Sequence, residues 1–111
     1  MSVDSTGRVL TEARIETVGD LWAVEHGLLP ADQIRRITVP DAVVDTGSTT
    51  LALPTRLIRQ LGLTMSYQKF AASSRGVGPV SVYSAVRLTL LDRFCTLDVM
   101  EAPDDVPPLI G

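Results

Sequence analysis

The sequence is poor in cysteine, histidine and aromatic residues. Its 111 residues contain one cysteine, Cys95, and one histidine, His26. A lone cysteine cannot form an internal disulfide, and these two side chains are too few soft ligands for a zinc site. We therefore expect no metal, no cofactor and a reducing, cytoplasmic location. Cys95 lies in an alternating apolar run, which predicts a small buried hydrophobe, whereas His26 is predicted to face water at the end of a short helix.

Aromatic side chains number five, although hydrophobic residues make up 45% of the chain. The core must therefore be built mainly from Val, Leu, Ile and Ala. Trp22 is expected to pack the short helix that carries it onto the rest of the fold.

The chain also lacks a basic face and long apolar runs. Its net charge is −3, and Arg35-Arg36 is the one adjacent pair among ten basic residues. Nucleic-acid binding needs a basic patch or stripe, so no nucleic-acid partner is expected. No apolar run approaches the roughly 20 residues of a membrane span, and the first residues lack a secretory signal pattern. We expect neither a membrane partner nor secretion.

What remains is a mainly β pattern of about seven short strands and two short helices in one domain, residues 1–111. Its predicted fold is a small closed β-barrel. Pro40-Asp41 is predicted to break one strand, and the segment 73–79 to form the turn of a hairpin. Strands are expected over 7–17, 34–39, 42–45, 51–53, 64–72, 80–86, 86–91 and 94–100.

Both helices are placed by their end signals. The first is expected over 21–26, with Asp20 as N-cap and Gly27 as stop. Pro54-Thr55 opens the second, whose apolar face holds Leu57, Ile58 and Leu61 and whose C-cap is Gly62. The Pro-rich segment 102–108, with Asp104-Asp105, is expected to be a solvated loop.

The segment Asp45-Thr46-Gly47-Ser48 lies between two apolar runs, Ala42-Val43-Val44 and Leu51-Ala52-Leu53. Asp and Gly are common turn formers, so a plain hairpin turn is one interpretation. A surface turn does not require apolar flanks on both sides, however. A carboxylate between buried strands is costly unless it is satisfied, and one held beside hydroxyls can transfer protons.

This segment resembles the active-site loop of the retropepsin-like aspartic proteases, the single-domain relatives of pepsin. The run 54–63 is similar to the short helix after that loop in bacterial members, and Gly76-Val77-Gly78 falls where the family has its flap. Leu109-Ile110-Gly111 is similar to the second apolar-apolar-Gly element, which packs beneath the loop. The matches follow the family's order over roughly residues 34–111.

The resemblance implies a small closed barrel of the acid-protease type and an aspartic endopeptidase acting on polypeptides. Asp45 would be catalytic, with Thr46 stiffening the loop, Gly47 allowing close backbone approach and Ser48 donating to the carboxylate. The chemistry needs two carboxylates that share a proton. No other acid of this chain is followed by Thr-Gly or Ser-Gly, so the resemblance implies a homodimer in which each subunit contributes Asp45.

The flap implied by the resemblance covers Arg75, Gly76, Val77 and Gly78. An ordinary mobile β-turn is the alternative. A Gly-x-Gly phosphate loop is disfavoured because no helix start follows it.

Family members continue beyond the apolar-apolar-Gly element into a helix and a strand, whereas this sequence ends at Gly111. We therefore expect a domain lacking those elements, dimerisation through other strands, or an inactive fragment. Two further interpretations stay open: a non-catalytic, dimeric β-barrel interaction module with the same fold, and an unrelated β-domain with Asp45 in a turn.

Overall fold

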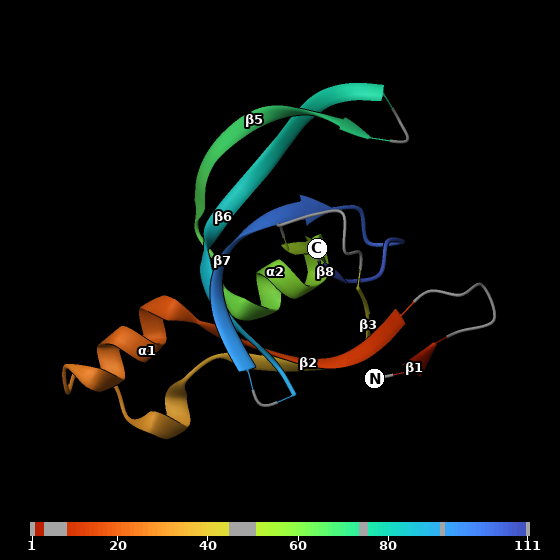
Figure 1. Cartoon of the computed structure of the whole chain (residues 1–111). Helices are drawn as coiled ribbons and strands as arrows, with labels where there is room; N and C mark the ends of the chain where they lie inside the picture. Colours follow the sequence, from red (N-terminus) through yellow and green to blue (C-terminus); the bar gives the residue numbers. More distant parts are fainter. Residues whose placement is uncertain (1, 4–8, 45–50, 74–75, 92, 111) are drawn as a thin grey trace.

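The computed structural model describes residues 2–3, 9–44, 51–73, 76–91 and 93–110. Within these residues the chain forms eight strands, two α-helices and a short 3₁₀ turn (Figure 1). In chain order they are β1 (Ser2–Val3), β2 (Val9–Thr17), α1 (Val18–Glu25), the 3₁₀ turn (Ala31–Gln33), β3 (Arg36–Val44), β4 (Leu51–Pro54), α2 (Thr55–Leu61), β5 (Met65–Ser73), β6 (Gly76–Leu90), β7 (Arg93–Ala102) and β8 (Leu109–Ile110).

Six strands form a closed ring. The order is β2, β3, β8, β4, β7 and β6, and β6 pairs back onto β2. The pairs β3–β8 and β4–β7 are parallel, and the other four are antiparallel. β1 adds to β2, and β5 adds to β6 outside the ring. The predicted mainly β fold with two short helices is confirmed, because period-two alternation gives each ring strand one inward, apolar face.

The inside of the ring holds an almost purely aliphatic core, as the shortage of aromatics predicts. β2 contributes Ala13 and Ile15, β6 contributes Val86 and Leu88, and α2 contributes Ile58 and Leu61. The complete buried cluster is Ala13, Ile15, Ile37, Ala42, Leu51, Leu53, Ile58, Leu61, Val86, Leu88, Val99 and Ile110. Since these side chains come from every strand of the ring, burial rather than local propensity keeps the sheet closed.

Helix α1 begins three residues earlier than the pattern indicates. Its N-cap is Thr17, whose hydroxyl accepts a hydrogen bond from the Asp20 backbone N–H at 3.3 Å, so the prediction of Asp20 as N-cap was wrong. A threonine at the end of a strand can cap the following helix directly. The expected end is confirmed: His26 is the C-cap, and Gly27 follows it with φ 72°.

Trp22 does not pack α1 onto the ring. Its side chain is 53% exposed and stacks on the exposed His26 ring, with 4.1 Å between the ring centroids. The four-residue spacing brings the two rings together on one face of the helix. The prediction for Trp22 was therefore wrong, whereas the solvent-facing position of His26 is confirmed.

Strand β3 runs through Pro40-Asp41 without a break. Val39 pairs with Ala13 and Ala42 with Thr11, so two residues of β3 lie opposite one residue of β2. This is a β-bulge, which accommodates proline in a strand because the bulged residue has no place in the ladder. Within the described residues, the predicted strands 34–39 and 42–45 thus belong to one strand, β3.

Strand β6 is likewise one strand of 15 residues, which serves two hairpins. Its first part pairs with β5 up to Ser73↔Gly76, so the connecting turn is shorter than the predicted 73–79. Gly78 lies within the strand, opposite Ala71. The second predicted hairpin, between β6 and β7, is confirmed by the pairing Leu90↔Arg93.

Cys95 is exposed, which contradicts the expected burial. It lies in the first half of β7, where the described neighbour is β6, because β4 pairs with β7 only from Val99 onward. The alternating sequence around Cys95 therefore has no second strand beside it to complete a buried surface.

Helix α2 matches its prediction. It covers Thr55–Leu61, buries Ile58 and Leu61, and ends at Gly62 with φ 65°. The Arg35 side chain lies where a Cβ on Gly62 would project. Gly62 therefore combines a left-handed backbone with close packing.

We predict that Gly62→Ala lowers the free energy of unfolding by about 2–3 kcal/mol, from the left-handed penalty plus displacement of Arg35. Urea denaturation measures this change. Gly27→Ala is the matched control, because Gly27 has φ 72° but open space around its Cβ position. It should cost about 1 kcal/mol. Equal losses in both variants would contradict the packing role of Gly62.

Candidate active site

The four residues predicted to carry the chemistry, Asp45, Thr46, Gly47 and Ser48, lie outside the described residues. The structure does describe the strand ends on both sides of them. β3 ends at Val44 and β4 begins at Leu51, and both strands belong to the closed ring. Residue 45 follows directly on β3 in the sequence, and Ala42 and Val43 at the end of β3 are buried.

Strand β8 lies between these two strand ends. Ile110 pairs with Val44 on one side and with Leu51 on the other, and Leu109 pairs with Val43 and Ala52. The Val43 backbone N–H also donates to the Pro108 carbonyl at 2.9 Å. Because neighbouring strands are about 4.8 Å apart, Val44 and Leu51 are held about 10 Å apart.

The side chains at the start of β4 and the end of β8 also pack into the core. Leu51 is fully buried and Ile110 is 6% exposed. The packing of Leu109-Ile110 against the strands on both sides of residues 45–50 agrees with the position that the family resemblance implies.

The β5–β6 hairpin extends beyond the ring, as Figure 1 shows. We call residues 66–73 and 76–81 the arm. β5 pairs with β6 alone among the described strands. Phe70 and Val77 of the arm are 78% and 77% exposed. Of the four predicted flap residues, Arg75 lies outside the described residues, whereas Gly76, Val77 and Gly78 lie on the β6 side of the arm.

A polar cluster at the base of the arm escaped the sequence reasoning. The Thr55 hydroxyl donates to the Glu101 carboxylate at 2.7 Å, and the Tyr83 hydroxyl donates to its other oxygen at 3.3 Å. Partial burial and the nearby carboxylate raise the pKa of Tyr83 above its usual value, so the hydroxyl remains a donor at neutral pH. These partners lie 46 and 18 residues from Glu101, so no local motif could have indicated the cluster.

Aspartates in the last part of the described chain lie on exposed surfaces. Asp98 is exposed on β7, and Asp104 and Asp105 are exposed in the loop after it. Asp104 accepts a hydrogen bond from the Arg56 backbone N–H at 2.8 Å, in the first turn of α2. The solvated loop is confirmed, and Asp104 satisfies a helix N–H that has no partner within the helix.

The comparisons with known proteins point to one family. A family model described as aspartyl protease matches residues 33–94, which include Asp45 and the arm. The chain belongs to the aspartyl protease family. Its matched region begins just before β3 and ends early in β7.

One solved structure resembles this chain over its full length and indicates its fold. It is the crystal structure of a retropepsin-like aspartic protease from Rickettsia conorii, with a TM-score of 0.57 and 14% identity. The match covers 100% of this chain and 71% of that chain. The family member thus has the predicted retropepsin-like fold. No match was found among curated proteins.

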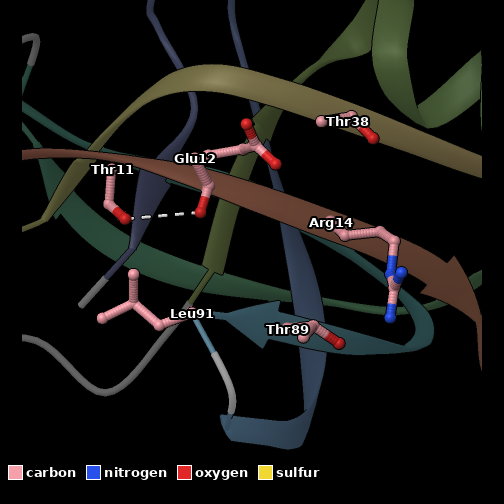
Figure 2. Close-up of a pocket in the computed structure, with 6 residues that line it drawn as sticks. All are labelled: Thr11, Glu12, Arg14, Thr38, Thr89 and Leu91. Atoms are coloured by element: carbon pink, nitrogen blue, oxygen red, sulfur yellow. Dashed lines mark hydrogen bonds between the residues drawn. The ribbon is translucent and has the colours of Figure 1, made fainter. Parts of the chain in front are cut away.

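A cavity of about 410 Å³ lies on the surface of β2 and its neighbours (Figure 2). Glu12 and Arg14 of β2 line it, together with hydroxyls that include Thr38 of β3 and Thr89 of β6. Thr11 donates to the Glu12 carbonyl at 3.3 Å at its edge. The described lining contains one carboxylate, so this cavity does not supply the pair of acids that the family's chemistry needs.

No helix among the described residues is both long and apolar enough to cross a bilayer.

Arg35, the residue before β3, forms an ion pair with Asp20 of α1 and a hydrogen bond with the C-cap residue of α2. The Arg35 guanidinium donates to both carboxylate oxygens of Asp20, at 2.9 and 3.1 Å, and its backbone N–H donates to one of them at 2.9 Å. Arg35 also donates to the Gly62 carbonyl at 3.5 Å. These hydrogen bonds hold the pKa of Asp20 far below its usual range.

We predict that Asp20→Asn lowers the free energy of unfolding by about 1–2 kcal/mol at pH 7. This loss is smaller than for a buried ion pair, because the Arg35 side chain is half exposed to water. A carboxylate with a lowered folded-state pKa stabilises the fold above its unfolded pKa. The difference from wild type should therefore be constant down to about pH 4 and shrink below it.

Urea denaturation at several pH values measures this difference. Asp32→Asn, at an exposed acid of the neighbouring 3₁₀ turn, is the control and should change little. A difference that vanishes near pH 6 would contradict the assignment.

Proposed function

We propose that this chain is an aspartic endopeptidase whose active site forms between two copies of the chain. The supporting observation is the family match over residues 33–94, which contains the Asp45-Thr46-Gly47-Ser48 motif. The strands that lead into and out of this motif are both anchored on β8, which suits a carboxylate that must be held in one position.

The proposed chemistry uses Asp45 of each subunit. Two carboxylates at close range cannot both ionise easily, so the pair keeps one proton. The ionised acid takes a proton from a water molecule, which attacks the scissile carbonyl, while the protonated acid donates a hydrogen bond to the carbonyl oxygen. The C–N bond then breaks, and the leaving amine takes a proton from the acid pair. The pair titrates as a unit, so neither pKa belongs to one residue. The two-fold axis of a homodimer brings identical residues together.

The residues after Asp45 support it in this proposal. Thr46 stiffens the two loops across the axis, Gly47 lets the backbone approach the carboxylate, and Ser48 donates a hydrogen bond to an outer oxygen of Asp45. Such a donor favours the ionised form and lowers its pKa.

The arm is the proposed flap. It extends from the ring, and the family match includes it. In this proposal, residues 75–78 close over an extended polypeptide, which binds as an added strand and is shielded from water. Cys95, as the one cysteine of the sequence, suits a reducing cytoplasm.

We predict that Asp45→Asn abolishes cleavage in a peptide-library digest and that it also inhibits wild type on mixing. At constant wild-type amount and free subunit exchange, an equal amount of variant should halve the activity, because about half of the wild-type chains then pair with variant. A threefold excess should leave about a quarter.

Asp41→Asn is the matched control, since Asp41 is an exposed acid four residues earlier. It should cleave normally and should not inhibit. Sedimentation reports the dimer independently. A dimer that cleaves no peptide between pH 4 and 7 would favour the non-catalytic interaction module, and an active monomer would overturn the shared site.

We further predict that Ser48→Ala moves the acidic limb of the pH–rate profile to higher pH. Loss of the hydroxyl donor raises the pKa of the acid that must be ionised. The ratio kcat/KM measured against pH checks the shift. An unchanged limb would remove Ser48 from the mechanism.

A further inference from the structure

The arm leaves the ring just beyond Tyr83, because the pairing of β6 with β7 ends at Val82↔Met100. Tyr83 pairs with Met65 of β5 and with Val99 of β7, so three strands meet there. The register shifts next to Tyr83 in both pairs: Ser66 is an extra residue in β5, and β6 has an extra residue between Tyr83 and Val86. Bulges bend strands and interrupt their ladders, so this is where the arm can change its angle to the ring.

A side-chain hydrogen bond joins β6 to β7 at this bend. The Tyr83 hydroxyl donates to Glu101 of β7, and Glu101 also accepts from Thr55, the first residue of α2. Thr55 follows directly on β4, the strand that begins after residues 45–50. Hydrogen bonds to a carboxylate are stronger than those between neutral groups, and all three residues are partly buried.

We propose that Glu101 is a positioning residue that sets the arm relative to β4 and α2, and so relative to the strand leaving the catalytic motif. This inference rests on the proposed function for its link to substrate, because the arm is the proposed flap. Arg59 of α2 also acts on this cluster, since its charge lowers the pKa of Tyr83 against the larger effect of burial. Through Glu101 of β7, these hydrogen bonds link β6 to the end of β4, the two strands that lie on either side of β7 in the sheet.

The test uses two hydroxyl deletions, Tyr83→Phe and Thr55→Val, and their combination. We expect amide hydrogen exchange over residues 66–73 to become about five- to tenfold faster in each single variant, a size typical of one lost hydrogen bond. Thr55 is not on the arm, and its hydroxyl reaches β7 through Glu101 and, more weakly at 3.4 Å, the Ala102 carbonyl, so its effect on the arm must pass through β7. The double variant should therefore exchange about as fast as the single ones.

Two controls accompany these variants. Thr55→Ser restores the hydroxyl and should return exchange to the wild-type rate. Thr89→Val removes a hydroxyl from the far end of β6 and should change neither exchange nor activity. In peptide cleavage, the deletion variants should raise KM by a similar factor and change kcat by less than about twofold, because the arm contributes to binding rather than to the acid pair.

Wild-type exchange of the arm in Thr55→Val would overturn the proposal, as would multiplied effects in the double variant or an unchanged KM. Exchange is measured without substrate. A chain that cleaves nothing would thus overturn the proposed function, while the exchange rates would still decide whether Glu101 positions the arm.

Discussion

The pairing of β8 with both β3 and β4 is the interaction on which the rest of the fold depends. Two residues, Leu109 and Ile110, complete a ring that would otherwise be open between Val44 and Leu51. Their backbone groups satisfy one edge of each neighbouring strand, and the Ile110 side chain joins the aliphatic core. The same pairing holds Val44 and Leu51, the described residues on either side of the acidic motif, so ring closure and the placement of these two strand ends have one cause.

The molecule thus combines a closed ring with an arm that is anchored at one end. The ring is held by burial of aliphatic side chains from all its strands, whereas the arm exposes large apolar groups such as Phe70. The proposed peptidase activity would use both properties, a carboxylate held still and a cover that lets substrate in and out. The cluster around Glu101 lies where the two parts meet, and Asp20–Arg35 ties both helices to the ring away from it.

Local patterns predicted the mainly β fold and α2, because alternation and helix-end signals act over a few residues. The Asp45 motif was readable for the same reason: its residues are contiguous. Features that depend on distant partners were missed. Pro40-Asp41 was read as a break because only the register against β2 reveals the bulge. Asp20 was read as a cap, although its decisive partner Arg35 lies 15 residues away, and Glu101 drew no attention at all.

The hairpins and the ring differ in how far apart their partners lie along the chain. Strands β5, β6 and β7 follow one another through short turns, whereas β3 must meet β8, which brings Val43 beside Leu109. Nearby segments find each other faster than distant ones, because less chain entropy is lost on contact. The arm is therefore expected to form early in folding and the ring late. During synthesis, the pairing of Val44 and Leu51 with β8 cannot form until Ile110 has emerged from the ribosome.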